Sequence, residues 1–236
     1  MPVRVLVALD TTDAAAAAAQ ADAVRGIVAG VKIGLEFFNA NGPAGVRQVM
    51  AAGDPVFLDL KFHDIPNTVA GAVRAVVPLL PFLLTVHVAG GSAMLQAAMA
   101  AAAETASRLG KPRPKIIGVT VLTSLSDEDL IEAGQRGPVD DQVRRLAALA
   151  QRCGLDGVVC SPHEIAALRA DCGAEFDLVV PGIRPAWAAA GDQKRTKTPA
   201  EAARLGASFL VIGRPITGAA DPAAAARRIH DELQAA

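Results

Sequence analysis

The sequence contains no tyrosine and one tryptophan, and it has no excess of either charge. Lysine and arginine together number 23 against 24 aspartates and glutamates, which gives a formal charge of −1. Nucleic acids and anionic membranes are held by broad cationic surfaces, which this composition does not supply. No run approaches the roughly 20 apolar residues needed to span a bilayer. We therefore expect neither a nucleic acid nor a membrane as a partner.

Cysteine is scarce as well. Cys153, Cys160 and Cys172 form no C-x-x-C pair and are odd in number, so they indicate neither a disulfide framework nor a zinc site. The apolar run at residues 3–9 lacks the basic start and the small-residue cleavage site of a signal peptide. These features predict a cytoplasmic protein with reduced thiols.

Short β-rich runs alternate with longer alanine-rich helical stretches along the whole chain. Strands are predicted at residues 3–9, 30–34, 55–62, 83–88, 115–122, 157–161, 178–183 and 209–213. Helices are predicted at residues 14–24, 43–52, 68–77, 92–109, 141–153, 162–171, 199–205 and 222–233. Eight β/α units in 236 residues predict an α/β fold of the TIM (β/α)8 barrel type, with residues 1–236 in a single domain.

An open, doubly wound sheet is the alternative fold. In that fold a glycine-rich turn after the first strand commonly binds the phosphates of a dinucleotide. Here the first strand is followed by Asp10-Thr-Thr-Asp13, which has no glycine. The sequence therefore disfavours a nicotinamide or flavin cofactor, and we expect none.

The third predicted strand carries the most informative pattern. Alternation places one apolar row on the face toward the helices: Val56, Leu58, Leu60 and Phe62. The opposite face carries Asp59 and Lys61, and Asp64 follows in the loop. Barrel enzymes place their active sites at the carboxyl ends of the strands. We therefore expect Asp59 and Lys61 to point into the mouth of the barrel.

Two more charges stand at neighbouring strand ends. Lys32 belongs to the second strand, and Asp10 ends the first. Alternating carboxylates and ammonium groups keep one another ionised, because each has an opposite charge nearby to offset desolvation. A buried ion-pair network without catalytic function is the alternative interpretation. The position at the strand ends favours a catalytic array.

Anion-binding residues follow the seventh and eighth strands. Loops at these two positions commonly hold a phosphate group in this fold. The first loop contains Arg184 and Gln193, and the second contains Gly213 and Arg214. Glycine permits close approach of the backbone, and the arginine guanidinium matches phosphate oxygens. This pattern predicts a phosphorylated substrate.

Together these residues resemble the orotidine 5'-phosphate decarboxylases of the bacterial type. The resemblance covers essentially the whole chain, and the long third-strand motif is its most specific part. The motifs are Ala8-Leu-Asp10, Val31-Lys-Ile-Gly34, Phe57-Leu-Asp-Leu-Lys-Phe-His-Asp-Ile-Pro-Asn-Thr68, Val86-His-Val-Ala-Gly-Gly91, Val119-Thr-Val-Leu-Thr-Ser124, Pro181-Gly-Ile-Arg184, Gly191-Asp-Gln193 and Ile212-Gly-Arg-Pro215.

The resemblance implies decarboxylation of orotidine 5'-monophosphate to UMP without a metal or cofactor. It implies that Lys61 protonates C6 of the ring and that Asp59 lies beside the scissile carboxylate. It also implies a homodimer in which Asp64 and Thr68 complete the neighbouring site. The remaining implied contacts are Asp10 and Lys32 to the ribose, Thr123 and Ser124 to the pyrimidine, and Arg184, Gln193, Gly213 and Arg214 to the phosphate and its closing loop.

Two rival functions remain open at this level. A related sugar-phosphate lyase would share the Asp-x-Lys-x-x-Asp pattern but would require magnesium, and Lys32 stands where such an enzyme is expected to have a carboxylate. The second rival is a barrel that binds a ligand without catalysing a reaction. The presence of the complete charged array argues against it.

We interpret His87 as an interior imidazole rather than a base, Cys160 as a small buried apolar residue, and Trp187 as a loop anchor.

Overall fold

The computed structural model describes residues 3–188 and 196–235. Within these residues eight parallel strands close into a barrel in chain order, with β1 hydrogen-bonded to β8. The strands are β1 Arg4–Ala8, β2 Gly30–Gly34, β3 Val56–Phe62, β4 Leu83–His87, β5 Lys115–Val119, β6 Gly157–Val159, β7 Asp177–Val180 and β8 Phe209–Ile212. The predicted TIM barrel is confirmed, and the open sheet is wrong.

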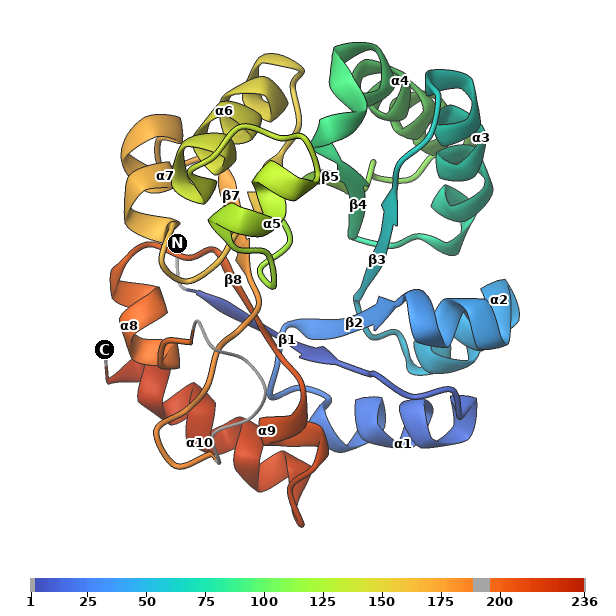
Figure 1. Cartoon of the computed structure of the whole chain (residues 1–236). Coiled ribbons are helices and arrows are strands. Elements are labelled where there is room, and N and C mark those ends of the chain that lie inside the picture. Colours follow the sequence, from blue (N-terminus) through green and yellow to red (C-terminus); the bar gives the residue numbers. More distant parts are fainter. Residues whose placement is uncertain (1–2, 189–195, 236) are drawn as a thin grey trace.

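Helices surround the strands (Figure 1). The α-helices in the described residues are α1 Ala14–Val24, α2 Leu35–Val49, α3 Pro66–Val76, α4 Gly91–Leu109, α5 Asp127–Glu132, α6 Val139–Arg152, α7 Ile165–Cys172, α8 Pro199–Arg204, α9 Arg214–Thr217 and α10 Pro222–Gln234. Single 3-10 turns occupy η1 Met50–Ala52, η2 Val77–Leu79 and η3 Val88–Gly90. No helix in the described part of the chain is both long and apolar enough to cross a membrane.

The predicted helix at residues 43–52 proved too short at its N-terminal side. The helix α2 begins at Leu35 and contains a kink at Gly42, whose φ of 58° is in the left-handed region that glycine adopts readily. Pro43 then opens the second half, since a proline fits the first turn of a helix. Pro43 therefore does begin a helical segment, but this segment is the second half of α2.

Two short helices, α5 and α9, were absent from the prediction. The acidic helix α5 is stabilised by a capping box, in which Ser126 and Asp129 each accept a backbone N–H of the other. The helix α9 is a single turn with Pro215 near its start. Both are too short to show an apolar period, which was the main signal used to find helices.

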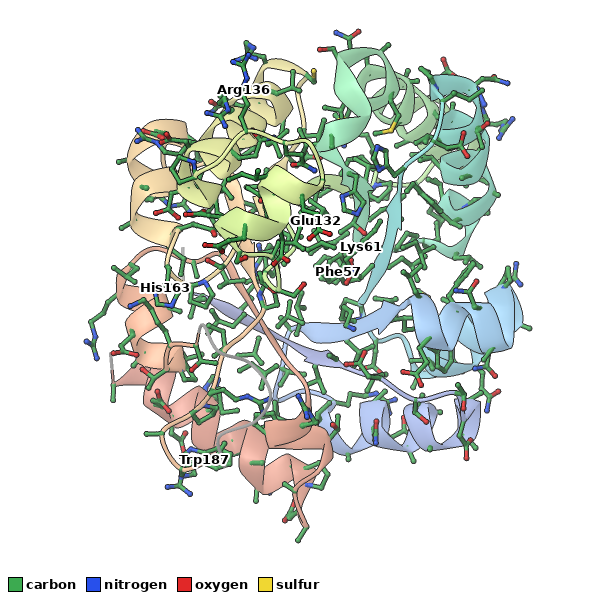
Figure 2. All side chains as sticks on the ribbon, viewed as in Figure 1. Phe57, Lys61, Glu132, Arg136, His163 and Trp187 are labelled. Carbon is green, nitrogen blue, oxygen red and sulfur yellow. The ribbon has the colours of Figure 1, made fainter. Side chains whose placement is uncertain are left out.

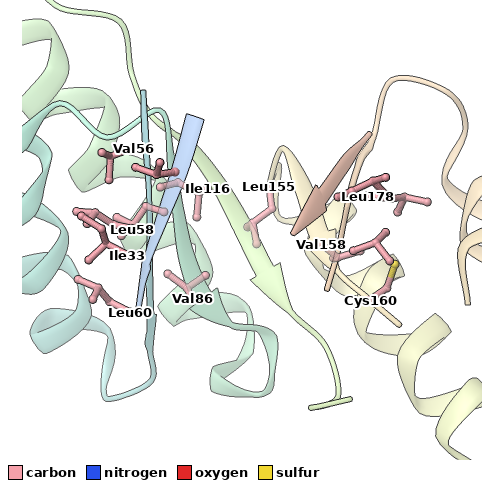
Figure 3. Close-up of a cluster of buried hydrophobic side chains, with 14 of the residues drawn as sticks. Ile33, Val56, Leu58, Leu60, Val86, Ile116, Leu155, Val158, Cys160 and Leu178 are labelled. Carbon is pink, nitrogen blue, oxygen red and sulfur yellow. The ribbon is translucent and has the colours of Figure 1, made fainter. Parts of the chain in front are cut away.

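Apolar side chains pack on both faces of the barrel wall. On the outer face, between strands and helices, Val56, Leu58 and Leu60 of β3 are 5% exposed or less. Figure 3 shows them beside Ile33 and Val86 of the neighbouring strands. The predicted division of β3 into two faces is thus confirmed for this apolar row.

A separate apolar plug fills the interior of the barrel. Its members are Leu6, Phe57, Leu83, Ile117, Val179 and Phe209, each 1% exposed or less. Side chains two positions further along the strands lie on the same interior face and one layer nearer the carboxyl ends. In β3 that next interior residue is Asp59, so the charged array begins directly above a dry apolar layer.

Close contact between strands β6 and β7 predicts a strong effect at Gly157. A Cβ placed on Gly157 would overlap the backbone carbonyl of Asp177, its partner in the β6–β7 register. We expect Gly157→Ala to lower the free energy of unfolding by about 1–3 kcal/mol, because the strands must separate to admit the methyl group. Urea unfolding measures the change.

The matched control for this substitution is Gly71→Ala in α3. A Cβ at Gly71 would have open space around it, and alanine is the better helix former. We expect Gly71→Ala to raise the free energy of unfolding by about 0.5–1 kcal/mol. Equal stabilities of the wild type and Gly157→Ala would contradict the tight strand contact.

Candidate active site

Four charged side chains from three adjacent strands form two ion pairs at the carboxyl end of the barrel. The Lys32 Nζ lies 2.6 Å from Oδ1 of Asp10. The Lys61 Nζ lies 2.7 Å from Oδ2 of Asp59. Figure 2 shows Lys61 on the side of β3 that faces the barrel centre, as Phe57 does below it. The strand ends thus bring together the four residues that the sequence placed in one array.

The two pairs differ in exposure. The side chains of Lys32, Asp59 and Lys61 are 11%, 15% and 27% exposed, whereas Asp10 is 59% exposed. Removing a charge from water costs several kcal/mol unless an opposite charge and hydrogen bonds replace the lost hydration. Each of the three shielded groups has such a partner within 2.7 Å.

Gly34 leaves room for the Lys32 ammonium. A Cβ at Gly34 would stand 3.2 Å from Nζ of Lys32 and 3.9 Å from Oδ1 of Asp10. A larger residue would therefore crowd the ion pair from the side of β2. The sequence motif Val31-Lys-Ile-Gly34 has a steric explanation at this position.

The backbone of Lys61 is unusual for a strand residue. Its φ is 49°, in the left-handed region, which costs a residue other than glycine roughly 1–2 kcal/mol. The Lys61 N–H donates to the hydroxyl of Thr85 at 2.8 Å, and this hydroxyl donates to Oδ1 of Asp59 at 3.0 Å. Strain of this kind persists where surrounding contacts hold it, and it is concentrated at functional sites.

Thr85 was not singled out from the sequence. It lies on the interior face of β4, two residues beyond the plug residue Leu83. Its position in the same barrel layer as Asp59 is the feature that could have identified it as a site residue. That feature could be used only once the register between β3 and β4 was known.

A cavity of about 230 Å³ connects the array to the loops after β7 and β8. Its lining includes Asp10, Lys32, Asp59, Arg184, Gly213 and Arg214. The cavity is therefore lined by the Asp10–Lys32 pair, by Asp59 and by two arginines, whereas Lys61, the partner of Asp59, is not among the lining residues. This arrangement suits an anionic ligand that extends from the array to the arginines.

Gly213 brings the backbone close to the array. A Cβ at this position would lie 3.4 Å from the side chain of Ala8 and 3.8 Å from Oδ2 of Asp10. The same residue precedes α9, whose first residue is Arg214. The prediction that these two residues adjoin the site is consistent with their place in the cavity lining.

Several predicted site residues lie elsewhere. Asp64 and Thr68 are exposed, in the β3–α3 loop and at the start of α3, and neither lines the cavity. Thr123 and Ser124 are in the loop between β5 and α5, also outside the lining. Gln193 lies outside the described residues. A single chain therefore does not bring the whole predicted set together.

The loop after β7 is held to the body of the protein by Trp187. The Arg228 guanidinium of α10 stacks over the indole ring, 4.7 Å from its centroid. Trp187 also packs against the outer apolar core. These contacts agree with its interpretation as a loop anchor.

Cys160 is a small buried residue, as expected, and His87 is the last residue of β4. His63 and His87 face each other near the array, with ring centroids 5.3 Å apart. The pKa of His87 is lowered, chiefly by desolvation and then by the positive charges of His63 and Lys61. Cys160 is fully buried, and burial raises its pKa well above the ordinary value. Its thiol is therefore a small apolar group rather than a nucleophile.

The lowered pKa of His87 predicts a pH dependence of stability. A histidine in the unfolded chain titrates near pH 6.5. Its contribution to stability is therefore complete above about pH 6.5 and is lost as the pH falls through the lower pKa of the folded protein. We expect the free energy of unfolding to decrease less between pH 7.5 and pH 5.5 in His87→Gln than in the wild type. Urea unfolding at the two pH values measures this, and equal decreases would refute the assignment.

Known proteins match this chain in sequence and in fold. The family model described as "Orotidine 5'-phosphate decarboxylase / HUMPS family" matches residues 3–229. A protein named orotidine 5'-phosphate decarboxylase from Paramagnetospirillum magneticum is 57% identical over 229 residues, covering 97% of both chains. One of the same name from Rhodospirillum rubrum is 59% identical over 230 residues, covering 97% of this chain and 93% of the relative.

The crystal structure of orotidine 5'-phosphate decarboxylase from Lactobacillus acidophilus superimposes with a TM-score of 0.87 at 37% identity and covers 99% of each chain. The match thus extends from sequence to the complete barrel. The family indicated by the sequence motifs is confirmed. The chain belongs to the orotidine 5'-phosphate decarboxylase / HUMPS family.

Proposed function

We propose that this protein decarboxylates orotidine 5'-monophosphate to UMP in pyrimidine biosynthesis, without a metal or cofactor. The observation that carries the proposal is a cavity lined by the Asp10–Lys32 pair, by two arginines and by Asp59, whose carboxylate is paired with Lys61. The names of relatives 50–59% identical over nearly the whole chain support the same activity. We expect the enzyme to act in the cytoplasm.

The reaction needs a positively charged group beside one carbon atom. When the C6–carboxylate bond breaks, carbon dioxide leaves and the electron pair stays on C6, in an orbital that the ring π-system cannot delocalise. The Lys61 ammonium stabilises this carbanion and then transfers a proton from Nζ to C6. Preorganised groups of this kind are worth about 3–4 kcal/mol each in the transition state.

Asp59 keeps that ammonium in place. Its carboxylate holds Nζ of Lys61 at 2.7 Å before the substrate binds, so little reorganisation is needed during the reaction. Asp59 would lie beside the scissile carboxylate of the substrate. Lys32 and Asp10, joined at 2.6 Å, would contact the ribose hydroxyls.

The phosphate and one edge of the pyrimidine are bound away from the reacting carbon. Arg184, Gly213 and Arg214 would hold the phosphate, together with Gln193. Thr123 and Ser124 would contact the edge of the pyrimidine. Binding energy from a remote phosphate can stabilise the reactive arrangement around C6. The position of both arginines in the same cavity as Asp59 supports this division.

The protein is proposed to act as a homodimer. Asp64 and Thr68 are exposed, and Ile65 between them is 67% exposed despite being apolar. A second subunit would cover Ile65 and receive Asp64 and Thr68 at the edge of its own site. This would account for two predicted site residues that lie outside the cavity of their own chain.

A magnesium-dependent sugar-phosphate lyase is the second candidate, because the matching family description includes HUMPS. Magnesium prefers carboxylate oxygens and repels an ammonium group. In this site Asp10 and Asp59 are already paired with Lys32 and Lys61. A divalent cation would have to displace a lysine, so the decarboxylase is favoured. The intact ion pairs likewise disfavour a barrel that binds ligand without catalysis.

Turnover in the presence of a chelator tests the proposal directly. We expect purified protein in EDTA to remove the orotate absorbance of orotidine 5'-monophosphate, and Lys61→Ala to lose turnover while still binding UMP. Absorbance spectroscopy and calorimetry measure the two quantities. Absence of turnover by the wild type, or magnesium-dependent activity on a sugar phosphate, would reject the proposed function. A wild-type rate in Lys61→Ala would reject the role of that lysine.

Subunit mixing tests the shared site. Lys61→Ala and Asp64→Asn should each be inactive alone. If Asp64 serves the neighbouring site, a mixed dimer contains one intact site with Lys61 from one chain and Asp64 from the other. Statistical exchange of subunits should then restore about a quarter of the wild-type activity.

The matched control mixes Lys61→Ala with Lys32→Ala. These lysines belong to the same chain's array, so no mixed dimer contains an intact site and no recovery is expected. Recovery only in the first mixture supports the shared site. Absence of recovery after subunit exchange has been verified by mass spectrometry would contradict it.

A further inference from the structure

We propose that Thr85 is a positioning residue for the charged array. Its hydroxyl fixes the carboxylate of Asp59 and the backbone of Lys61 in one geometry, so that the Lys61 ammonium stays paired with Asp59, which lines the cavity. This inference rests on the proposed function for its kinetic consequence. Its structural part stands on the contacts of Thr85 alone.

The need for Thr85 arises from an irregular register between β3 and β4. Leu58 pairs with Leu84 and Phe62 pairs with Val86, so β3 advances four residues while β4 advances two. Thr85 is the only residue of β4 between these two pairs. The backbone groups of the longer segment cannot all form hydrogen bonds with the backbone of β4. A side chain of β4 can supply a missing hydrogen-bond partner.

A hydroxyl meets this need because it donates and accepts at once. The Thr85 Oγ1 accepts the Lys61 N–H at 2.8 Å and donates to Oδ1 of Asp59 at 3.0 Å. The other oxygen of Asp59, Oδ2, holds Nζ of Lys61 at 2.7 Å. Lys61 is thus fixed at both ends, its amide by Thr85 and its ammonium by Asp59, and Thr85 closes the ring between them.

Burial makes the hydroxyl hard to replace. Thr85 is 0% exposed, so bulk water does not compete for its two hydrogen bonds. Without the hydroxyl, the Lys61 N–H and one Asp59 oxygen would both lose a partner. The left-handed backbone of Lys61, at φ 49°, would then lose the contact that holds it. The backbone is expected to relax and carry the ammonium with it.

Thr85→Val is the informative substitution because it removes the hydroxyl and keeps the shape of the side chain. Displacements of about 1 Å in an active site can cost about 100-fold in rate. We expect kcat on orotidine 5'-monophosphate to fall by about that factor, while KM and the Kd of UMP change less than about threefold, because the arginines at the phosphate end are untouched. Thr85→Ser keeps the hydroxyl and should recover kcat to within about fivefold of the wild type.

Thr120→Val is the matched control. Thr120 is also a buried threonine, and its hydroxyl donates at 2.9 Å to the backbone carbonyl of Val159 rather than to an array residue. We expect this variant to keep the wild-type kcat whatever its effect on Tm. The control separates loss of a buried hydroxyl in general from loss of the hydroxyl that contacts Asp59 and Lys61.

Hydrogen exchange at the Lys61 amide provides a readout that does not depend on turnover. In the wild type this N–H is bonded to the hydroxyl of the fully buried Thr85, so it should exchange slowly. In Thr85→Val it should exchange faster, whereas Thr85→Ser and Thr120→Val should retain protection. Exchange is measured by NMR or by mass spectrometry of a peptide that contains residue 61.

The outcomes separate the two proposals. If the wild type decarboxylates the nucleotide and Thr85→Val has the same kcat, the positioning role is wrong. Equal losses of kcat and UMP affinity in Thr85→Val, without rescue by Thr85→Ser, would show a merely structural role and would also overturn it. If the wild type has no activity, the proposed function fails, and unchanged exchange at Lys61 in Thr85→Val would independently overturn the positioning of Lys61.

Discussion

The pairing of Lys61 with Asp59 is the interaction on which the rest of the site depends. It lies immediately above an apolar plug that includes Phe57 and Leu83, where an unpaired charge would lose hydration without compensation. The apolar layer excludes water from beneath the pair, and each charge of the pair compensates the other. Lys32 and Asp10 form a second ion pair of this kind on the adjacent strands.

The barrel determines where these charges meet. Parallel strands have their carboxyl ends at one rim, and closure of the sheet brings β8 beside β1. Residues distant in sequence, such as Asp10 and Arg214, therefore line one cavity. In the proposed reaction, the arginines would hold the phosphate and the array would act on the ring, so binding energy from the phosphate would serve the chemistry.

Much of this could be predicted from local pattern. Alternation along β3 gave the correct faces for Leu58 and Asp59, because side chains in a strand alternate strictly. The alternation of strands and helices indicated the barrel, since parallel strands need helical crossovers. The prediction failed where the pattern was short or interrupted. The helix α5 has six residues, and the kink at Gly42 hid the first half of α2.

The barrel, the four array residues and their place at the strand ends could be predicted from the order of amino acids, because they follow from periodicity and strand order. How the array is held could be seen only in the folded protein. The left-handed backbone of Lys61 and its contact with Thr85 depend on the irregular register of two strands, which no local pattern encodes. The exposure of Asp64 was likewise fixed by the path of a loop. Contacts between distant residues are set by packing of the whole barrel, and periodicity reports only on neighbours in the chain.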